Sequence, residues 1–343
     1  MPHVPPSMER ELASGLGPVK VPVGSGLVVV DKPAGLTSHD IVSRVRRLAG
    51  TRKVGHAGTL DPMATGVLLL GVEKATRLLG HLASTDKSYD ATIRLGAATG
   101  TDDAEGDVIT PRHELTGDGR RKTVHEVTGA AIRAEVLKLT GDIEQRPSAV
   151  SAIKVDGVRA YARVRKGEDV ALPARAVTVS VFDVFEIRAV DAMTTLTDAE
   201  DSAAESAHTV VYPALDVDVT VSCSTGTYIR ALARDLGEAL GVGGHLTSLR
   251  RTRVGPYDIS SARSLEQLTE SFDVIPLSRV VADTFARIEV DEADAAKVRN
   301  GVRLAWPPDL EPTGPIGVFA PDGGVLALAE HKAGSMAYLA VLD

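Results

Sequence analysis

The sequence predicts an α+β fold with one large unit and a small β-rich module at its C-terminal end. Segments with strand periodicity and segments with helix periodicity are interspersed irregularly between residues 27 and 240. From Arg287 onward, only short strand-like segments follow one another. With 343 residues and 43% hydrophobic content, the chain can bury one large core and a small second one.

The predicted helices are placed by their end signals as well as by apolar spacing. Thr37 or Ser38 can cap a helix whose apolar residues, spaced three and four apart, share one face, and Gly50 ends it. Further helices are predicted at residues 74–82, 131–139 and 228–240.

Strands are predicted where β-branched or alternating apolar residues lie between turn residues. They are residues 27–30, 67–72, 89–95, 177–187 and 217–221, followed in the C-terminal module by 288–290, 316–319, 325–328 and 338–342. The run Pro-Asp-Gly-Gly at residues 321–324 predicts a hairpin turn. Residues 101–125 are rich in Asp, Gly and Thr and are expected to form a surface loop.

Several classes of protein are excluded by composition. Residues 1–24 contain prolines and charges but no apolar segment, which predicts a disordered extension rather than a signal peptide. No apolar run approaches the roughly 20 residues that span a bilayer. The single cysteine, Cys223, excludes an internal disulfide and a cysteine-based zinc cluster. We therefore expect a cytoplasmic protein without a membrane segment or a metal.

Charge is distributed unevenly along the chain. The net charge of −8 argues against non-specific coating of nucleic acid. Seven acids and no Lys or Arg lie between Asp191 and Asp218, and the stretch near 190–210 is expected to be an acidic, mobile insertion. Three basic clusters, which are compatible with specific binding of one RNA, lie at residues 44–53, 159–166 and 250–253.

The most informative stretch is KVGHAGTLDPMATG, at residues 53–66. Its glycines and its proline predict a loop set by turn chemistry, and the apolar run that follows predicts a buried strand. A single carboxylate, Asp61, is thus placed on a stiff loop directly before core structure, where functional groups often lie. A solvated turn aspartate would not explain the neighbouring His56 and the glycines.

This stretch resembles the active-site motif of the TruB family of tRNA pseudouridine synthases. Four other blocks resemble family motifs in the family's order. They are GLVVVDKPAGLTS at residues 26–38, KSYDA at 87–91, CSTGTYIR at 223–230 and LRRTRVG at 249–255. Together the five blocks cover about residues 25 to 256.

The resemblance implies a fold and a domain organisation. The fold would be the pseudouridine synthase fold, with a mixed, mainly antiparallel sheet and flanking helices, followed by a small PUA-like β-barrel. We expect a catalytic domain at residues 25–284, with a thumb-like segment near 145–175 that closes over RNA. An RNA-binding PUA-like domain would occupy residues 285–343.

The resemblance also implies an activity: isomerisation of the uridine at position 55 in the T arm of tRNA, by a monomer and without a cofactor or metal. Asp61 matches the catalytic aspartate, and its role as nucleophile or general base stays open. A carboxylate in a dry pocket needs a cation to stay ionised, and Arg230 matches the arginine that would pair with it.

Besides Arg230, four residues are expected to bind the substrate. By resemblance, Tyr89 stacks on the flipped base and lies near C5, and His56 fills the space that the flipped nucleotide leaves. Tyr228 is a further pocket candidate. Leu249 matches a pocket leucine, although an ordinary core position would explain it nearly as well.

Two observations keep alternatives in view. In the segment QRPSAVSAIK, residues 145–154, Ser148 replaces a family proline and Val150 replaces an aromatic residue, which puts a stacking role at Val150 in doubt.

A guide-RNA-dependent relative usually carries long basic tails, whereas this sequence ends at Asp343. A non-catalytic tRNA-folding chaperone is the alternative of another class, and the set of Asp61, Tyr89 and Arg230 favours catalysis.

Overall fold

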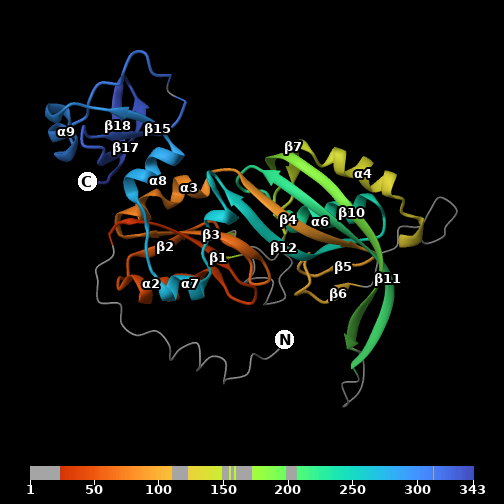
Figure 1. Cartoon of the computed structure of the whole chain (residues 1–343). Helices are drawn as coiled ribbons and strands as arrows, with labels where there is room; N and C mark the ends of the chain where they lie inside the picture. The colour runs from red at the N-terminus through yellow and green to blue at the C-terminus, as the bar shows by residue number, and fades with distance from the viewer. Residues whose placement is uncertain are drawn as a thin grey trace. The chain divides into compact units, whose positions relative to one another are not determined.

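The computed structural model describes residues 24–109, 123–148, 154–155, 158–159, 172–197, 207–311 and 313–343. The chain divides into two compact units (Figure 1). The first contains the residues up to Thr85 and from Arg253 onward, and the second runs from Asp86 to Thr252. In the described part of the chain, no helix has the length and apolar character that crossing a membrane requires.

The sheet of the first unit places two apolar strands in its core. β1 (Gly26–Lys32) runs antiparallel to β3 (Thr65–Val72), and β2 (Val54–Ala57) also pairs antiparallel with β3. Both faces of β1 and β3 are buried, which explains their uninterrupted apolar runs. The remaining strands of this unit's sheet are β14 (Ile275–Pro276), which pairs with β1, and β13 (Tyr257–Asp258), which pairs with the end of β12 (Gly244–Val254).

The helix predicted after Thr37 is confirmed as α2 (Ser38–Ala49). Thr37 and Asp40 form a capping box, and Gly50 ends the helix in the left-handed region with φ of 65°. The predicted helix at 74–82 begins as a 3₁₀ helix, η1 (Glu73–Leu78), and continues as α3 (Leu79–Ala83). The other helical segments are η3 (Ile259–Ser261), α7 (Leu265–Glu270) and α8 (Leu277–Thr284).

The predicted β-rich module is confirmed as a four-stranded sheet within the first unit. Its elements are β15 (Ala286–Glu289), α9 (Glu292–Arg299), β16 (Ile316–Phe319), β17 (Val325–Lys332) and β18 (Ser335–Val341). β15 and β16 are parallel and the other pairs are antiparallel. Phe319, Leu328 and Leu342 of this module share a hydrophobic core with residues such as Leu78 and Leu82.

The second unit is built on long antiparallel strands. β4 (Lys87–Leu95) pairs with β11 (Ala207–Cys223), β11 with β10 (Arg175–Thr197), and β10 with β7 (Gly141–Gln145). α4 (Gly129–Lys138) packs against β10, and α6 (Ile229–Ala239) packs against β4. The short elements are η2 (Val124–Glu126), β5 (Ala98–Thr99) with β6 (Val108–Ile109), and β8 (Lys154–Val155) with β9 (Val158–Arg159).

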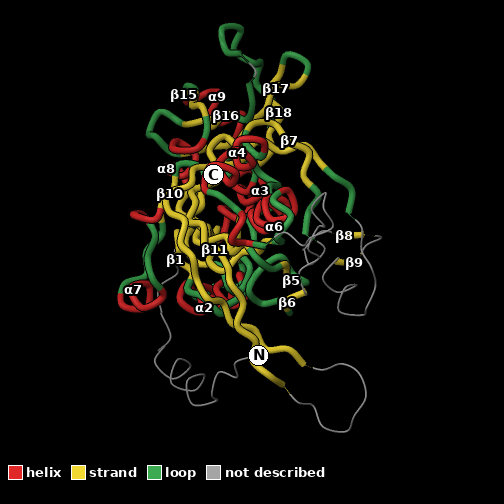
Figure 2. Tube along the Cα trace, turned by 90° about the vertical axis from the view of Figure 1, so that its right-hand side faces the viewer, coloured by secondary structure: helices red, strands yellow, loops and turns green. Residues whose placement is uncertain are grey.

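β10 and β11 are longer than the sequence predicts. The ladder continues to Thr197 opposite Ala207, so residues 190–197 and 207–210 are paired strands, and the expected mobile insertion is wrong for them. Figures 1 and 2 show β10 and β11 running side by side, and the pairing of β11 with β4 ends where Leu215 lies opposite Leu95. This stretch consists largely of polar and small residues, which show no apolar alternation. Its strands form through backbone hydrogen bonds between β10 and β11, and the sequence pattern therefore does not predict them.

The remaining predictions from the sequence have mixed outcomes. The surface loop expected at 101–125 is wrong at Asp103, which is only 2% exposed. The extension at residues 1–23, most of the thumb-like segment and Val150 lie outside the described residues. The α+β class with mainly antiparallel sheets and flanking helices is confirmed, whereas the domain boundary near residue 285 stays a prediction.

Candidate active site

The loop that carries Asp61 joins β2 to β3, and its backbone is fixed on both sides of the carboxylate. The Ser38 hydroxyl, in the first turn of α2, accepts the Leu60 N–H at 2.9 Å and donates to the Leu60 carbonyl at 3.1 Å. The Asp61 carbonyl accepts the Ala64 N–H at 3.1 Å, which closes a tight turn. Asp61 itself is half-buried.

Lys32 fixes the other side of this loop. It is fully buried, and its ammonium donates to the carbonyls of Pro33, Leu36 and Pro62 at 2.9, 2.6 and 3.2 Å. The Gly35 N–H donates to the Pro62 carbonyl as well, at 2.8 Å. An ammonium offers three donors, so Lys32 ties the turn after β1 to the residue that follows Asp61. The carboxylate is therefore held by a preorganised backbone.

His56 lies on β2 opposite Leu70 and is half-buried. Its ring makes an edge-to-face contact with the ring of His39 on α2, with centroids 5.5 Å apart. The sequence offers no signal for this contact, since the two residues lie far apart along the chain. His56 lies near the end of β2, and Asp61 lies on the loop that follows this strand. The role of His56 in substrate positioning stays a prediction.

Tyr89 lies on β4 opposite Val221 and is 7% exposed. Lys87 precedes it by two residues on the same face of the strand, and it is also buried. Burial and, to a lesser degree, the nearby Arg251 guanidinium lower the pKa of Lys87 to about 8. Arg251, a member of the third basic cluster, is 1% exposed and therefore offers no surface for RNA binding.

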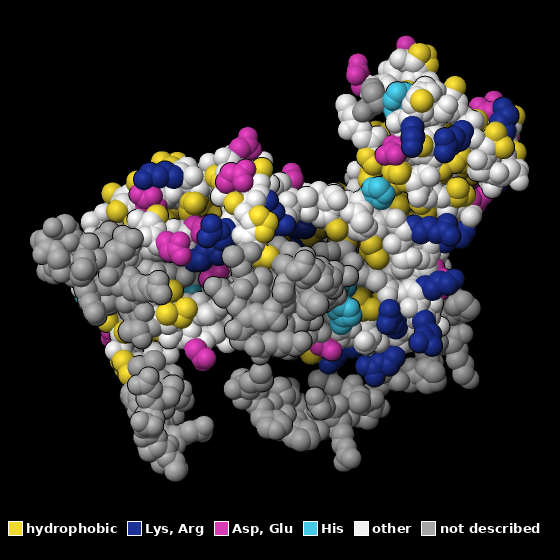
Figure 3. Space-filling view, turned by 180° about the vertical axis from the view of Figure 1, so that it is seen from behind, with side chains coloured by type: hydrophobic (Ala, Val, Ile, Leu, Met, Phe, Trp, Pro, Cys, Tyr) yellow, Lys and Arg dark blue, Asp and Glu magenta, His cyan; other side chains and the backbone are white. Residues whose placement is uncertain are grey.

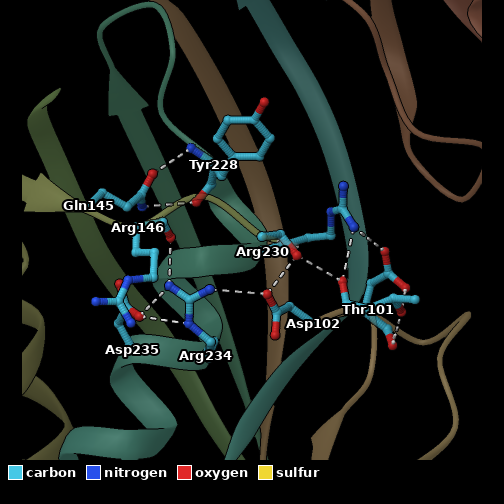
Figure 4. Close-up of polar contacts among 10 residues, drawn as sticks. Thr101, Asp102, Gln145, Arg146, Tyr228, Arg230, Arg234 and Asp235 are labelled. Atoms are coloured by element: carbon cyan, nitrogen blue, oxygen red, sulfur yellow. Dashed lines mark hydrogen bonds and ion pairs between the residues drawn. The ribbon is translucent and has the colours of Figure 1, made fainter. Parts of the chain in front are cut away.

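Tyr228 caps α6 through its backbone rather than through its side chain. The Gln145 amide accepts the Tyr228 N–H at 2.8 Å and donates to the Tyr228 carbonyl at 3.0 Å (Figure 4). The Arg175 guanidinium lies over the Tyr228 ring, 4.9 Å from its centroid, in a cation–π arrangement. Gln145 thus fixes the N-terminus of the helix that carries Arg230.

Arg230 is buried at the start of α6 and pairs with a carboxylate of the same unit. Its Nη1 atom lies 3.2 Å from Asp103 Oδ2 and donates to the Thr101 carbonyl at 2.9 Å (Figure 4). The Thr99 hydroxyl holds the Asp103 carbonyl at 2.7 Å, and the Glu105 N–H donates to Asp103 Oδ1 at 3.0 Å. This arrangement presents a guanidinium in a fixed orientation.

Asp103 is a site residue that sequence reasoning missed. A polar, glycine-rich run does not indicate which of its acids is buried. The available signal was Arg230 itself, because an arginine that is buried for a functional role needs a carboxylate or other polar partner. The remaining candidate, Leu249, is 7% exposed on β12, which fits a core position and a pocket wall equally.

Basic side chains gather on the surface of the protein (Figure 3). In the first cluster, Arg46, Arg47, Arg52 and Lys53 are exposed on the first unit, as predicted. Lys53 is paired with Glu73 at 3.4 Å. In the second cluster, at residues 159–166, no side chain is described.

Models of three related protein-family domains together match this chain from residue 46 almost continuously to residue 343. The model of the TruB family pseudouridylate synthase N-terminal domain matches residues 46–229. The tRNA pseudouridylate synthase B C-terminal domain matches residues 230–281, and the tRNA pseudouridine synthase II C-terminal domain matches residues 285–343.

Similar proteins agree with these matches. A tRNA pseudouridine synthase B of Streptomyces griseus is 54% identical over 92% of this chain and 96% of the relative. One of Corynebacterium glutamicum is 51% identical over 90% of this chain and 92% of the relative. Among solved structures, a chain of a Cbf5-Nop10-Gar1 complex has a TM-score of 0.64 at 23% identity, covering 93% of this chain and 84% of that one. The structural likeness shows the shared fold, and the sequence matches show that this chain belongs to the TruB family of pseudouridylate synthases.

Proposed function

We propose that this chain isomerises uridine to pseudouridine in tRNA, at position 55 of the T arm. Membership of the TruB family and relatives named tRNA pseudouridine synthase B support the activity and the substrate class. The position in the tRNA rests on the motif resemblance. The proposal includes action by a monomer in the cytoplasm, without a cofactor or metal.

The observation that carries the proposal is the anchored loop around Asp61. The reaction breaks the bond between N1 and C1′, turns the uracil, and rejoins it through C5. A carboxylate that adds to C1′ or removes the 2′ proton must be held close to the sugar, because misplacement lowers the rate steeply. Ser38 and Lys32 supply that constraint from the two sides of Asp61.

Arg230 would keep Asp61 ionised and oriented. A guanidinium has five N–H donors in a planar fork, so pairing with Asp103 is compatible with a second carboxylate. The Asp103 contact fixes the plane of the guanidinium, and a fixed cation stabilises a developing charge better than one that must reorient.

Substrate binding would divide between stacking and phosphate contacts. Tyr89 would stack on the flipped uracil, Tyr228 and Leu249 would line the same pocket, and His56 would fill the vacated space. The exposed basic residues at 46–53 and the C-terminal module would contact the phosphate backbone, with the salt dependence that such contacts bring.

One assay tests this proposal against its alternatives. Purified protein is incubated with an unmodified tRNA transcript and no guide RNA, and position 55 is probed for pseudouridine. A transcript with cytidine at this position is the matched control. Modification at position 55 supports the proposal, modification that requires a guide RNA indicates a guide-dependent synthase, and tRNA folding without modification indicates a chaperone.

A further inference from the structure

Two arginines one turn apart on α6 face two consecutive aspartates (Figure 4). Arg230 lies 3.2 Å from Asp103, and Arg234 lies 3.3 Å from Asp102 Oδ2. Residues four apart on a helix share a face, so one short segment meets both guanidinium groups. The first pair belongs to the proposed active site, and the second has no role in the chemistry described above.

The Asp102 carboxylate is held from two directions. Its Oδ2 atom accepts the Ser148 hydroxyl at 2.6 Å as well as the Arg234 contact. The backbone of Asp102 has φ of 60°, in the left-handed region that aspartate tolerates but does not favour. Side-chain contacts therefore help to keep Asp102 in this conformation.

The conformation of Asp102 determines where the Thr101 carbonyl points. That carbonyl and the Asp102 N–H belong to one planar peptide group, which turns as a unit when φ of Asp102 changes. The Thr101 carbonyl accepts Arg230 Nη1 at 2.9 Å and lies 3.3 Å from the Ser148 hydroxyl. A continuous set of contacts thus joins Ser148 and Arg234 to Arg230.

Arg234 is itself well fixed. Its Nη2 atom donates to the Arg146 carbonyl at 2.7 Å, and its Nε atom donates to Asp235 at 2.9 Å. Ser148 is 1% exposed, and it lies two residues after Arg146. Both partners of Asp102 are therefore rigid, which a supporting contact requires.

We propose that Ser148 and Arg234 are positioning residues that hold Asp102, and through the Thr101 carbonyl orient the Arg230 guanidinium for catalysis. The inference rests on the proposed role of Arg230. Ser148 stands where the family motif has proline, which has no side-chain donor, so the hydroxyl contact is a feature of this sequence rather than of that motif.

The test uses the full-length protein and an unmodified tRNA transcript. Ser148→Ala and Asp102→Asn are compared with Ser180→Ala, a matched control whose hydroxyl donates to the Ser222 carbonyl in an exposed position. We expect the single-turnover rate to fall about tenfold in the first two variants, as for the loss of a hydrogen bond to a charged group. The Kd for tRNA should change less than about twofold, because the proposal gives Ser148 and Asp102 no contact with RNA.

A double variant tests whether the effect passes through Arg230. Ser148→Ala added to Arg230→Lys should slow the reaction no further, whereas independent effects would multiply. Multiplying effects, or rates of Ser148→Ala and Asp102→Asn equal to that of Ser180→Ala, would overturn the inference. A near-normal rate for Arg230→Lys alone would instead contradict the proposed role of Arg230, on which the inference rests, whereas absence of pseudouridine formation by the wild type would contradict the proposed function. Asp102→Asn keeps the shape of the side chain, and its single-turnover rate therefore provides an independent test if Ser148→Ala unfolds more easily.

Discussion

Arg230 and Asp103 form an ion pair at 3.2 Å in which both side chains are almost completely buried. Removing two charges from water costs several kcal/mol for each ion, and mutual attraction only partly offsets that cost. Stability alone is therefore a weak reason for such a pair. The proposed catalytic role of Arg230, which needs a guanidinium held in one orientation, is a better one.

Arg230→Lys should lose most activity, by about a hundredfold or more, although the charge is kept. An ammonium does not reproduce the planar fork that contacts Asp103 and the Thr101 carbonyl together. Single-turnover kinetics measure the effect, with Arg188→Lys on the exposed face of β10 as the control. Equal rates in the two variants would mean that Arg230 is structural only.

Lys87 should make stability depend on alkaline pH. Its pKa in the folded protein is about 8, below the ordinary 10.5, so the unfolded chain binds more protons between these values. The free energy of unfolding attributable to Lys87 should then rise with pH from about 8 to about 10.5, by on the order of 3 kcal/mol. Chemical denaturation of Lys87→Met, which should lose this rise, checks the prediction against Lys138→Met, an exposed control. The same pH dependence in Lys87→Met and the wild type would contradict it.

The outer part of the β10–β11 ribbon should be dispensable for folding. Beyond Leu215 opposite Leu95, β11 has no pairing with β4, and Met193 and Val211 are exposed opposite each other. Replacing residues 193–211 by Asn-Gly should join Ala192 to Tyr212 and change the free energy of unfolding by less than about 1 kcal/mol. A large fall in the thermal unfolding midpoint would contradict this prediction and show that the outer part of the ribbon stabilises the fold.

Phe319 should contribute to the stability of the first unit as a whole. It is 1% exposed in the core shared with Leu78 and Leu82, so Phe319→Ala should cost about 3–5 kcal/mol. Leu339→Ala, at a position 38% exposed, is the control and should cost much less. Similar losses would mean that the C-terminal module folds apart from this core.

This shared core changes how the module's role in RNA binding is best tested. Truncation from about Arg287 is expected to weaken tRNA binding more than chemistry, but it also removes Phe319, Leu328 and Leu342 from the core. Loss of binding by a truncated chain could then reflect unfolding. Surface substitutions in the full-length protein, with binding measured at two salt concentrations, avoid this problem.

Local signals in the sequence predicted the elements that depend on local physics. The α2 helix follows from the Thr37 cap, the apolar stripe and Gly50, all of which act within a few residues. The position of Asp61 before a buried strand follows from turn chemistry in the same way. These interactions need no knowledge of distant partners.

Non-local partners explain what the sequence did not predict. Asp103 is buried because it meets Arg230, which lies more than a hundred residues away. The mostly polar residues around Asp103 in the sequence give no sign of this burial. The extension of β10 to Thr197 depends on the register with β11 rather than on apolar alternation. Burial of Arg251 likewise has no local signature within a basic run.

The most direct test of the central claim is the rate of pseudouridine formation by Asp61→Asn. This change removes the charge and keeps the shape, on a loop whose backbone is fixed by Ser38 and Lys32. We predict no measurable product in a single-turnover assay, tRNA binding within about threefold of the wild type, and normal activity of the exposed control Asp183→Asn. Substantial turnover by Asp61→Asn would contradict the assignment of Asp61 as the catalytic carboxylate.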